Sequence, residues 1–508
     1  MTPETHLEQR TVFLQALRES RAGDARVAER RDGRLLPQRR TRSFGFVFCV
    51  LAVFGCGKNE DGRAEKTSEV REPVGQAAKT ASGAPSPAPA AASAEVAPPV
   101  KGPGRPLNVL LLTVDSLRAD MPWTGYARPI APNLTKLAAE SVVYENHRSV
   151  SSYTAQTVAT WLTGRYASTL YREGYFFTGY APANDFITEA LQAKGIRTLG
   201  VQAHGYFGRA KGLDQGFDSW EVVKGVTFDA QTDKNVTSEK SATRIIELLG
   251  DPANTKGQFF LWSHFMDPHD EYKKHAESPD FGKKNRDRYD SEVWYTDFWL
   301  GKVLEFCKAQ SWWKDTALIV TADHGEAFGE HGMYKHAFEV WDVLTRVPLI
   351  VHAPGAAPHR IRELRTHIDI APTVLDLMGQ KPLPGFQGQS LVPEIYGAET
   401  PQVREPVLLE LAEDSHNPAR RAIVAGDYKL IVFGTGQRFL FDLKSDPGEE
   451  KNLAKSHPDK LAEMQALFDK AFAAVPSIEP YGGMKLSSGR IAKGPRGPAE
   501  EKAKAPAD

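Results

Sequence analysis

Apolar runs alternate with amphipathic segments through the middle of the chain. Continuous apolar runs, which are typical of buried parallel strands, occupy 108–114 and 317–320. Further strands are predicted at 197–202, 259–263 and 347–352. This alternation predicts an α/β fold, in which a large, mostly parallel sheet is covered by helices on both faces. The helical patterns between the strands cover 185–194, 238–249 and 291–309.

A different pattern follows after about residue 405. Short strand-like segments around Ala422, Leu430 and Leu440 come before an amphipathic helix at 458–473. Several short strands in succession favour antiparallel pairing. We therefore expect a small C-terminal antiparallel sheet that carries one helix.

The N-terminal part ends in a short apolar run at 44–55, followed by Cys56. The run is too short to cross a bilayer as a stable helix. Arg39 and Arg40 precede it, as in the charged region of a secretory signal. Residues 53–56 resemble a bacterial lipobox, so Cys56 is the expected site of lipid attachment. A plain signal peptide with a chance cysteine is the alternative.

Two segments have a composition that cannot bury enough apolar area to fold. Ala, Pro, Ser, Gly, Glu and Lys dominate 57–106, and the chain after Ile478 is similar. We expect both segments to be disordered. The chain then divides into an N-terminal extension with a lipoprotein-type signal (1–56), a tether (57–106), a catalytic domain (107–400), a C-terminal subdomain (401–477) and a disordered tail (478–508).

Composition narrows the class of function. The 508 residues carry 63 basic and 64 acidic side chains, so the net charge is -1. This balance creates no overall field toward nucleic acid, and no nucleic-acid partner is expected. Only three cysteines occur, which implies neither a disulfide framework nor a thiolate metal site. The oligomeric state has no signal in the sequence.

Two predicted strand ends carry side chains that can bind a metal. Asp323 and His324 follow the run at 317–320, and Asp115 follows the first strand. Ligands usually bind at strand ends in an open α/β sheet, and a carboxylate beside an imidazole is a suitable pair of metal ligands. Taken singly, Asp115 would be a turn cap and His324 a solvated residue. Together they predict one shared metal site.

The segment 151–165 predicts a third component of this site. Residues 155–162 have a helical pattern, and Thr154 is expected at the N-cap. A hydroxyl there faces unpaired N–H groups and the positive end of the helix dipole, which suits a nucleophile that meets an oxyanion. An ordinary cap is the commoner use of threonine, so both interpretations stay open at this point.

Several blocks of the sequence, in order, resemble the sulfatases of the alkaline phosphatase superfamily. The resemblance covers roughly 107–475 and implies an alkaline phosphatase-like fold. It also implies an enzyme that hydrolyses ester bonds. The matching blocks are 113–120, 162–165, 264–272, the Asp-His-Gly-Glu block at 323–326, 346–350, 369–373, 426–430, 440–443 and 446–453.

The resemblance implies one divalent metal ion, held by Asp115, Thr154, Asp323 and His324. Coordination would lower the pKa of the threonine hydroxyl and orient its oxygen for in-line attack. Calcium sulfatases often have two adjacent Asp residues in the first block, whereas Ser116 follows Asp115 here. Fewer carboxylates and one imidazole favour manganese or zinc slightly over calcium.

Four more residues receive roles from the resemblance. His269 matches the family histidine that contacts the ester and can protonate a leaving group. Lys335 matches the family lysine that binds the anion. A surface-loop histidine and a solvated lysine are the alternatives. His331 and His336 are expected to contact substrate, with a structural role as their alternative.

The chain departs from the family at its defining motif, Cys/Ser-x-Pro-Ser-Arg, whose first residue is oxidised to formylglycine. Thr154 takes that first position, and Gln156, Thr157 and Val158 replace Pro, Ser and Arg. Threonine cannot become formylglycine. Relatives that use an unmodified threonine include the phosphoethanolamine and lipoteichoic-acid transferases, which act on phosphodiesters through a phospho-threonine.

The sequence therefore predicts a sulfatase-like, metal-dependent hydrolase of sulfate or phosphate esters that uses Thr154 as nucleophile. Its expected substrate is a small-molecule or glycan ester. The alternatives are a phosphodiester transferase of the kind just named, and a non-catalytic relative that binds a sulfated or phosphorylated glycan. We expect the protein to be exported and lipid-anchored through Cys56 to a bacterial membrane, facing the periplasm or the exterior.

Overall fold

The computed structural model describes residues 102–209, 211–229, 233–397 and 406–500. The predicted signal with Cys56, most of the predicted tether, and the predicted boundary at residue 400 lie outside the described residues. Among the helices of the described residues, none combines the length and the apolar composition that crossing a membrane requires.

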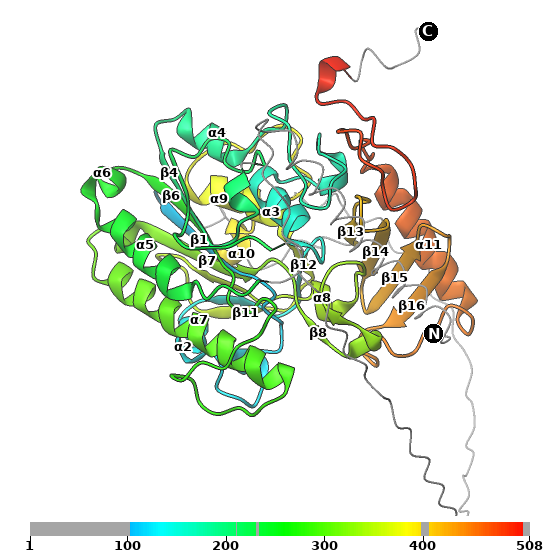
Figure 1. The fold of residues 1–508 in the computed structure, drawn as a ribbon, viewed down its shortest axis with the longest axis horizontal. Helices are drawn as coiled ribbons and strands as arrows, with labels where there is room; N and C mark the ends of the chain where they lie inside the picture. The colour runs from blue at the N-terminus through cyan, green and yellow to red at the C-terminus, as the bar shows by residue number, and fades with distance from the viewer. Residues whose placement is uncertain (1–101, 210, 230–232, 398–405, 501–508) are drawn as a thin grey trace, which may run out of the picture. The chain divides into compact units, whose positions relative to one another are not determined.

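Within the described residues, eight strands form the main sheet. They are β1 (Asn108–Val114), β2 (Val142–Tyr144), β4 (Arg197–Gln202), β5 (Ser219–Val222), β6 (Phe259–Phe265), β7 (Thr316–Ala322), β10 (Leu349–His352) and β11 (His359–Ile361). Their order is β11-β2-β10-β7-β1-β6-β4-β5. Only β10 runs antiparallel to its neighbours, β2 and β7, and the other pairs are parallel. This confirms the expected large, mostly parallel sheet (Figure 1).

Strand β1 shows why helices must cover both faces of this sheet. All seven of its residues are buried. Val109 and Leu111 pack into one hydrophobic cluster, whereas Leu110 and Leu112 pack into a second. Because successive side chains of a strand point to opposite faces, a continuous apolar run is stable only when both faces are covered.

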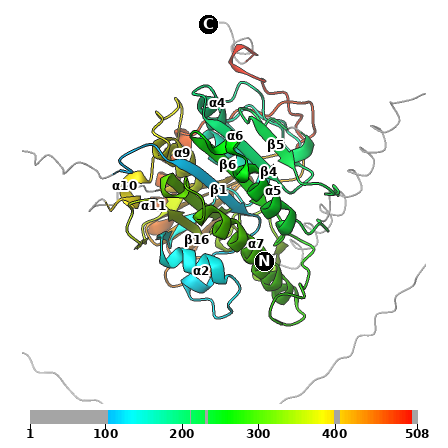
Figure 2. The same ribbon diagram turned by 90° about the vertical axis from the view of Figure 1, so that its left-hand side faces the viewer.

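The helices supply these two covers. Figures 1 and 2 show α5 and α7 (Ser238–Gly250 and Asn285–Lys308) lying side by side across one face. The hydrophobic cluster to which α5 and α7 contribute also includes α2 (Pro132–Ala139). The cluster on the opposite face of the sheet includes α3 (Thr154–Thr163) and α9 (Ile370–Leu377). The shorter helices are α4 (Ile187–Gln192), α6 (Pro252–Thr255), α8 (Asp342–Thr345) and α10 (Val392–Ile395).

A second, four-stranded sheet is antiparallel throughout. It consists of β13 (Val407–Leu411), β14 (Arg420–Ala425), β15 (Tyr428–Phe433) and β16 (Arg438–Asp442). Helix α11 (Pro458–Ala473) covers one face of this sheet, and Leu430 belongs to the same hydrophobic cluster as the buried residues of α11. Ile431 points to the other face and belongs to the cluster of the main core. The predicted C-terminal sheet with one helix is thus confirmed (Figure 1). Two small ladders complete the strands: β3 (His147–Arg148) with β12 (Arg365–Thr366), and β8 (Ala327–Phe328) with β9 (Tyr334–Lys335).

The predicted disorder after Ile478 is wrong for residues 478–500, which pack on the domain. The Ile478 N–H donates to the Ser168 carbonyl at 2.8 Å, and the Tyr481 N–H donates to the Arg172 carbonyl at 2.9 Å. Tyr481, Leu486 and Ala492 are buried. A few apolar anchors with backbone hydrogen bonds therefore order a segment whose average composition predicted disorder. Residues 501–508 lie outside the described part.

Candidate active site

The carboxyl ends of three adjacent strands bring three buried side chains together. Asp115 follows β1 and Asp323 follows β7, while His264 lies in β6 opposite Thr113 of β1. One ligand atom from each of Asp115, His264 and Asp323 lies within 4.8 Å of the others. The two aspartates were predicted to meet at one sheet edge, whereas His264 was not among the predicted ligands. Its signal was available, because His264 opens the block at 264–272.

Thr154 and His324 lie against this cluster. Thr154 Oγ1 donates to Asp115 Oδ2 at 3.3 Å and lies 3.1 Å from His324 Nε2. His324 Nε2 is in turn 3.2 Å from Asp323 Oδ2. The four residues of the predicted metal set, which lie far apart in the sequence, therefore converge.

Thr154 does not occupy the N-cap that the sequence analysis assigned to it. Helix α3 begins at Thr154, and Tyr153 is the N-cap without a side-chain hydrogen bond. The N–H groups of Gln156 and Thr157 donate to the Tyr153 carbonyl instead. The Thr154 hydroxyl is directed to Asp115 and His324.

The electrostatics of the buried cluster fit a divalent cation. Burial raises the pKa of Asp323, and the nearby Asp115 raises it further. Burial also acts to raise the pKa of Asp115, but His269, His264 and His324 together hold it well below its ordinary value. Two buried carboxylates that face one another repel, so a cation between them relieves a large desolvation and repulsion cost.

Both imidazoles of the cluster are oriented through their other ring nitrogen. His324 Nδ1 lies 3.0 Å from the Gly325 carbonyl, which can only accept, so Nδ1 donates and Nε2 is the nitrogen that faces the cluster. His264 Nδ1 lies 2.8 Å from Thr113 Oγ1, and the Trp262 indole N–H also donates to that oxygen at 3.0 Å. Such outer hydrogen bonds are typical of histidines that bind metals.

Ser116, which directly follows Asp115 in the chain, hydrogen-bonds to both carboxylates of the cluster. Its φ of 56° lies in the left-handed region, and its N–H donates to Asp323 Oδ1 at 3.1 Å. Its hydroxyl donates to Asp115 Oδ1 at 2.7 Å. Ser116 therefore links both carboxylates without adding a charge.

Three histidine rings extend the site away from the strand ends. The ring of His336 stacks on His324 with centroids 4.1 Å apart and meets His269 at 4.9 Å. His269 also lies 6.5 Å from His204, a further neighbour that the sequence analysis did not single out. The structure thus brings His269 and His336 next to the predicted metal ligands.

The buried Glu326 lies beside these histidines. Its Oε2 is 3.6 Å from His336 Nδ1, and burial raises the pKa of Glu326 to about 7. Burial alone would lower the pKa of His269, yet Asp115, Glu326 and Asp233 raise it above its ordinary value. His269 is therefore placed to hold a proton. Glu326 belongs to the Asp-His-Gly-Glu block, but the sequence analysis gave it no role.

Lys335 and His331 have different surroundings. The Lys335 ammonium pairs with Asp270 Oδ2 at 2.5 Å, and Asp270 directly follows His269 in the chain. Lys335 is therefore held beside the loop that carries His269. The ring of His331 instead stacks on Trp341 with centroids 4.1 Å apart, and Trp341 contacts Phe441 of β16. This placement supports the structural alternative for His331.

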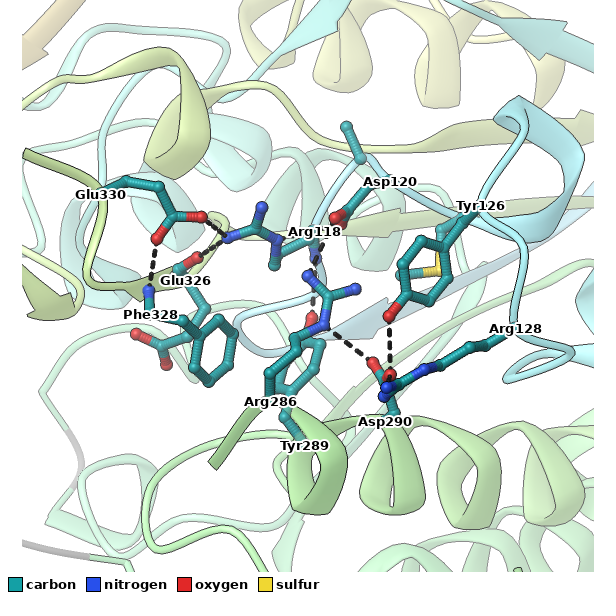
Figure 3. Close-up of polar contacts among 12 residues, drawn as sticks. Arg118, Asp120, Tyr126, Arg128, Arg286, Tyr289, Asp290, Glu326, Phe328 and Glu330 are labelled. Atoms are coloured by element: carbon teal, nitrogen blue, oxygen red, sulfur yellow. Dashed lines mark hydrogen bonds and ion pairs between the residues drawn. The ribbon is translucent and has the colours of Figure 1, made fainter. Parts of the chain in front are cut away.

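Arg118 connects the loops that carry the two aspartates (Figure 3). Its Nη1 donates to the Glu326 carbonyl at 2.6 Å and to Glu330 Oε1 at 2.8 Å, and its Nε donates to Asp120 at 2.9 Å. Arg286 of α7 donates to the other oxygen of Asp120 at 2.8 Å. These bonds fix the loop after β1 against the loop after β7 and against α7.

Two family models match the chain. The model described as Sulfatase matches residues 107–380, which is more than half of the chain. The chain belongs to the sulfatase family. A second model, described as N-sulphoglucosamine sulphohydrolase, C-terminal, matches residues 329–475. The resemblance inferred from the motif blocks is thereby confirmed, and the expected class, an ester hydrolase, agrees with this family.

Named relatives show the range of the sulfatase family around this chain. A choline-sulfatase from Rhizobium meliloti is 31% identical over 177 residues, which are 34% of each chain. The match thus spans about a third of that relative. An ulvan-active sulfatase from Formosa agariphila is 25% identical over 404 residues, 69% of this chain and 77% of that one. The solved phosphonate monoester hydrolase of Agrobacterium radiobacter shares the fold, with a TM-score of 0.59, 19% identity, and coverage of 72% and 95%.

Two of the departures from the sulfatase nucleophile motif, Gln156 and Val158, have structural explanations. Gln156 accepts the Ala412 N–H through Oε1 and donates to the Ala412 carbonyl through Nε2, both at 2.9 Å. It therefore joins helix α3 to the chain that follows β13. Val158 is fully buried in the main core. A glutamine and a valine here stabilise the fold around Thr154, so their presence is compatible with an active site.

Proposed function

We propose that this sulfatase-family protein is a metal-dependent hydrolase of sulfate or phosphate esters, with Thr154 as its nucleophile. The observation that supports this most directly is the contact of the Thr154 hydroxyl with Asp115 Oδ2 and His324 Nε2. A threonine that only stabilised a helix would not need these two buried partners. The proposed substrate is a small-molecule or glycan ester.

The first step is attack of Thr154 Oγ1 on the sulfur or phosphorus atom. Asp115 Oδ2 accepts the hydrogen bond of the hydroxyl and is in place to take its proton as the new bond forms, while His324 Nε2 lies 3.1 Å from the same oxygen. The bond between the central atom and the leaving oxygen then breaks, which leaves an ester on Thr154.

His269 and Lys335 act on the other side of the reacting group. His269, whose pKa is raised by its acidic neighbours, donates a proton to the leaving oxygen. The Lys335 ammonium is paired with Asp270 and is placed to attract the anionic group of the substrate. A water molecule then attacks the ester on Thr154, and the hydroxyl is regenerated as sulfate or phosphate leaves.

The residues that would hold the divalent ion are Asp115, Thr154, Asp323 and His324, with His264 as a further ligand. Such an ion lowers the pKa of a bound hydroxyl and offsets negative charge on a substrate oxygen. The imidazoles favour manganese or zinc over calcium. The protein's own contribution is to hold these ligands at three strand ends by the bonds of Ser116, Thr113 and Arg118.

A panel of esters tests this function. Purified protein is assayed with aryl sulfate, phosphate monoester, phosphodiester and phosphonate substrates, each with manganese, zinc and calcium. Hydrolysis by the wild type and none by Thr154→Ala supports the proposal. Transfer of the anionic group to an added alcohol, with little release to water, would instead support the phosphodiester transferase. Binding of a sulfated glycan without any turnover would support the non-catalytic relative.

We further propose that the protein is exported and lipid-anchored through Cys56 to a bacterial membrane, facing the periplasm or the exterior. Support comes from the sequence alone, where a short apolar run is followed by Cys56 and then by a polar segment. Such an anchor would place the sulfatase domain at the end of a tether near extracytoplasmic substrates.

A further inference from the structure

A cleft of about 690 Å³ opens beside the predicted substrate-contacting residues. One wall is the loop after β6, from Asp270 to Lys274, and the other is the first turn of α7, with Asn285 and Arg288. A volume of this size is typical of ligand sites. The cleft is therefore large enough to accept a sugar residue together with its substituents.

This cleft adjoins the loop that carries His269. Asp270 lines the cleft and directly follows His269, the proposed proton donor. The same Asp270 pairs with Lys335 at 2.5 Å. A substrate whose ester lies at Thr154, and whose remaining part extends past His269 and Lys335, would reach the cleft on the Asp270 side.

The charges of the cleft favour an anion. Lys273, Lys274 and Arg288 line it, against the two acids Asp270 and Glu271. The Asp270 carboxylate is already neutralised by Lys335, and Lys274 is paired with the exposed Asp280 at 2.9 Å. Lys273 directs its ammonium to the Lys234 carbonyl. The exposed Arg288 side chain makes no ion pair with any described residue, so its guanidinium is available to a ligand.

The first turn of α7, which carries Arg288, is held in place by the ion pairs of its neighbours. Its neighbour Arg286 donates to Asp120 at 2.8 Å and to Asp290 at 2.9 Å, which ties the first turns of α7 to the loop after β1 (Figure 3). Asp287 accepts from Arg128 at 2.8 Å and caps the start of the helix. An arginine fork on a fixed helix recognises a carboxylate or a sulfate with two parallel hydrogen bonds and loses little freedom.

We propose that this cleft binds a second anionic group of the substrate, a carboxylate or sulfate on a sugar next to the one that carries the scissile ester. This inference rests on the proposed function and deepens it. The substrate is then an acidic oligosaccharide, and Arg288 is a residue that sets specificity by binding it.

The test compares two substrates that share the same type of scissile ester. One is a sulfated, uronate-containing tetrasaccharide, and the other is a small aryl ester. The ratio of their kcat/KM values is measured for the wild type, Arg288→Ala and the control Lys302→Ala, which removes an exposed cation elsewhere on α7. We expect Arg288→Ala to lower the ratio about five- to tenfold, through KM of the tetrasaccharide. Added salt should weaken the wild-type preference, because exposed charges are screened.

An unchanged ratio in Arg288→Ala, or an equal fall in Lys302→Ala, would overturn the proposal. Calorimetric binding of the tetrasaccharide to Thr154→Ala, with and without Arg288→Ala, separates it from the proposed function. Binding that depends on Arg288 without any ester turnover would support the cleft and contradict the hydrolase. Turnover of the aryl ester by a protein that neither binds nor hydrolyses the tetrasaccharide would support the hydrolase and overturn the cleft.

Discussion

The Oγ1 atom of Thr154 lies 3.1 Å from the Nε2 atom of His324, although 170 positions separate the two residues in the chain. The Nδ1 atom of His324 donates to the Gly325 carbonyl, which orients the ring so that Nε2 faces Thr154. The first residue of α3 is thereby joined to the end of β7. This contact places an unmodified hydroxyl, rather than a formylglycine, at the centre of the site.

Thr154→Ala should abolish ester hydrolysis while the fold stays intact, and Thr154→Ser should keep part of the activity. Loss of the nucleophile should lower kcat by several orders of magnitude. Activity should also be independent of a co-expressed formylglycine-generating enzyme, because threonine is not its substrate. The rates are measured for the wild type and both variants, with and without that enzyme, and circular dichroism checks the fold. Near wild-type rates for Thr154→Ala would place the nucleophile elsewhere, with Ser151 or Ser152 next in line.

Metal content gives the second prediction. The purified protein should carry about one divalent ion per chain, and a chelator should remove both the metal and the activity. Asp115→Asn and His264→Ala should each weaken metal affinity at least about tenfold, because each removes a charge or lone pair from the buried cluster. Elemental analysis and metal titration measure this. His359→Ala, which removes a histidine distant in sequence from the cluster, is the matched control. No bound metal even after reconstitution would contradict the prediction.

Much of the fold could be predicted because its elements carry strong patterns. The apolar runs at 108–114 and 317–320 became β1 and β7, and the helix predicted at 458–473 became α11 with the same bounds. The strand ends then placed Asp115 and Asp323 together, because parallel strands share one carboxyl edge. The site was therefore predictable to the extent that it depends on sheet topology.

The remaining parts depend on contacts that a linear pattern does not record. His264 lies inside a buried strand, where its role follows from the register that sets it opposite Thr113 of β1. Local propensity placed Thr154 at the N-cap, whereas Tyr153 is the N-cap and the Thr154 hydroxyl contacts Asp115 and His324, the partners that the family resemblance implied. The segment at 478–500 has a composition typical of disorder. Tyr481 and Leu486 are nevertheless buried, and the Tyr481 N–H donates to the Arg172 carbonyl. In each case a tertiary contact outweighed the local signal.

Gln156→Ala should destabilise the protein by about 1–3 kcal/mol. The substitution leaves the buried N–H and carbonyl of Ala412 without the two side-chain partners that now satisfy them at 2.9 Å. Urea denaturation of the wild type and the variant measures the loss. Gln192→Ala is the control, because Gln192 makes an exposed side-chain bond to Asp218 and should change stability little. Equal effects of the two substitutions would show that the link to Ala412 contributes nothing specific.

Asp297 should make stability depend on pH. Burial raises its pKa from 3.8 to about 6, although the N–H groups of Leu134 and Asn133 act to lower it. The folded protein therefore holds this proton more tightly than the unfolded chain, so the contribution of Asp297 to stability is greatest below pH 4 and falls as pH rises toward 6. Since one pKa unit is worth about 1.4 kcal/mol, the fall is at most about 3 kcal/mol.

Asp297→Asn isolates this dependence, because asparagine does not ionise. The unfolding free energy of the wild type minus that of the variant should decrease as the pH rises from 4 to 7, because only the wild type loses stability when Asp297 ionises. Chemical denaturation at several pH values measures it. A difference that stays constant with pH would mean that Asp297 titrates alike in the folded and unfolded chains.

Cys56→Ser should release the protein from the membrane fraction if Cys56 carries a lipid. The expectation follows from the apolar run at 44–55 and the polar segment after it. Lipid chains bind membranes through their buried CH₂ groups, so removing the attachment site removes the anchor.

Cells that produce the full chain are fractionated, and the protein is located in each fraction. Cys307→Ala is the control, because Cys307 is buried in α7, where burial raises its pKa to about 12 and no lipid can reach it. Wild type and Cys56→Ser that are equally soluble, or both cytoplasmic, would contradict the anchor.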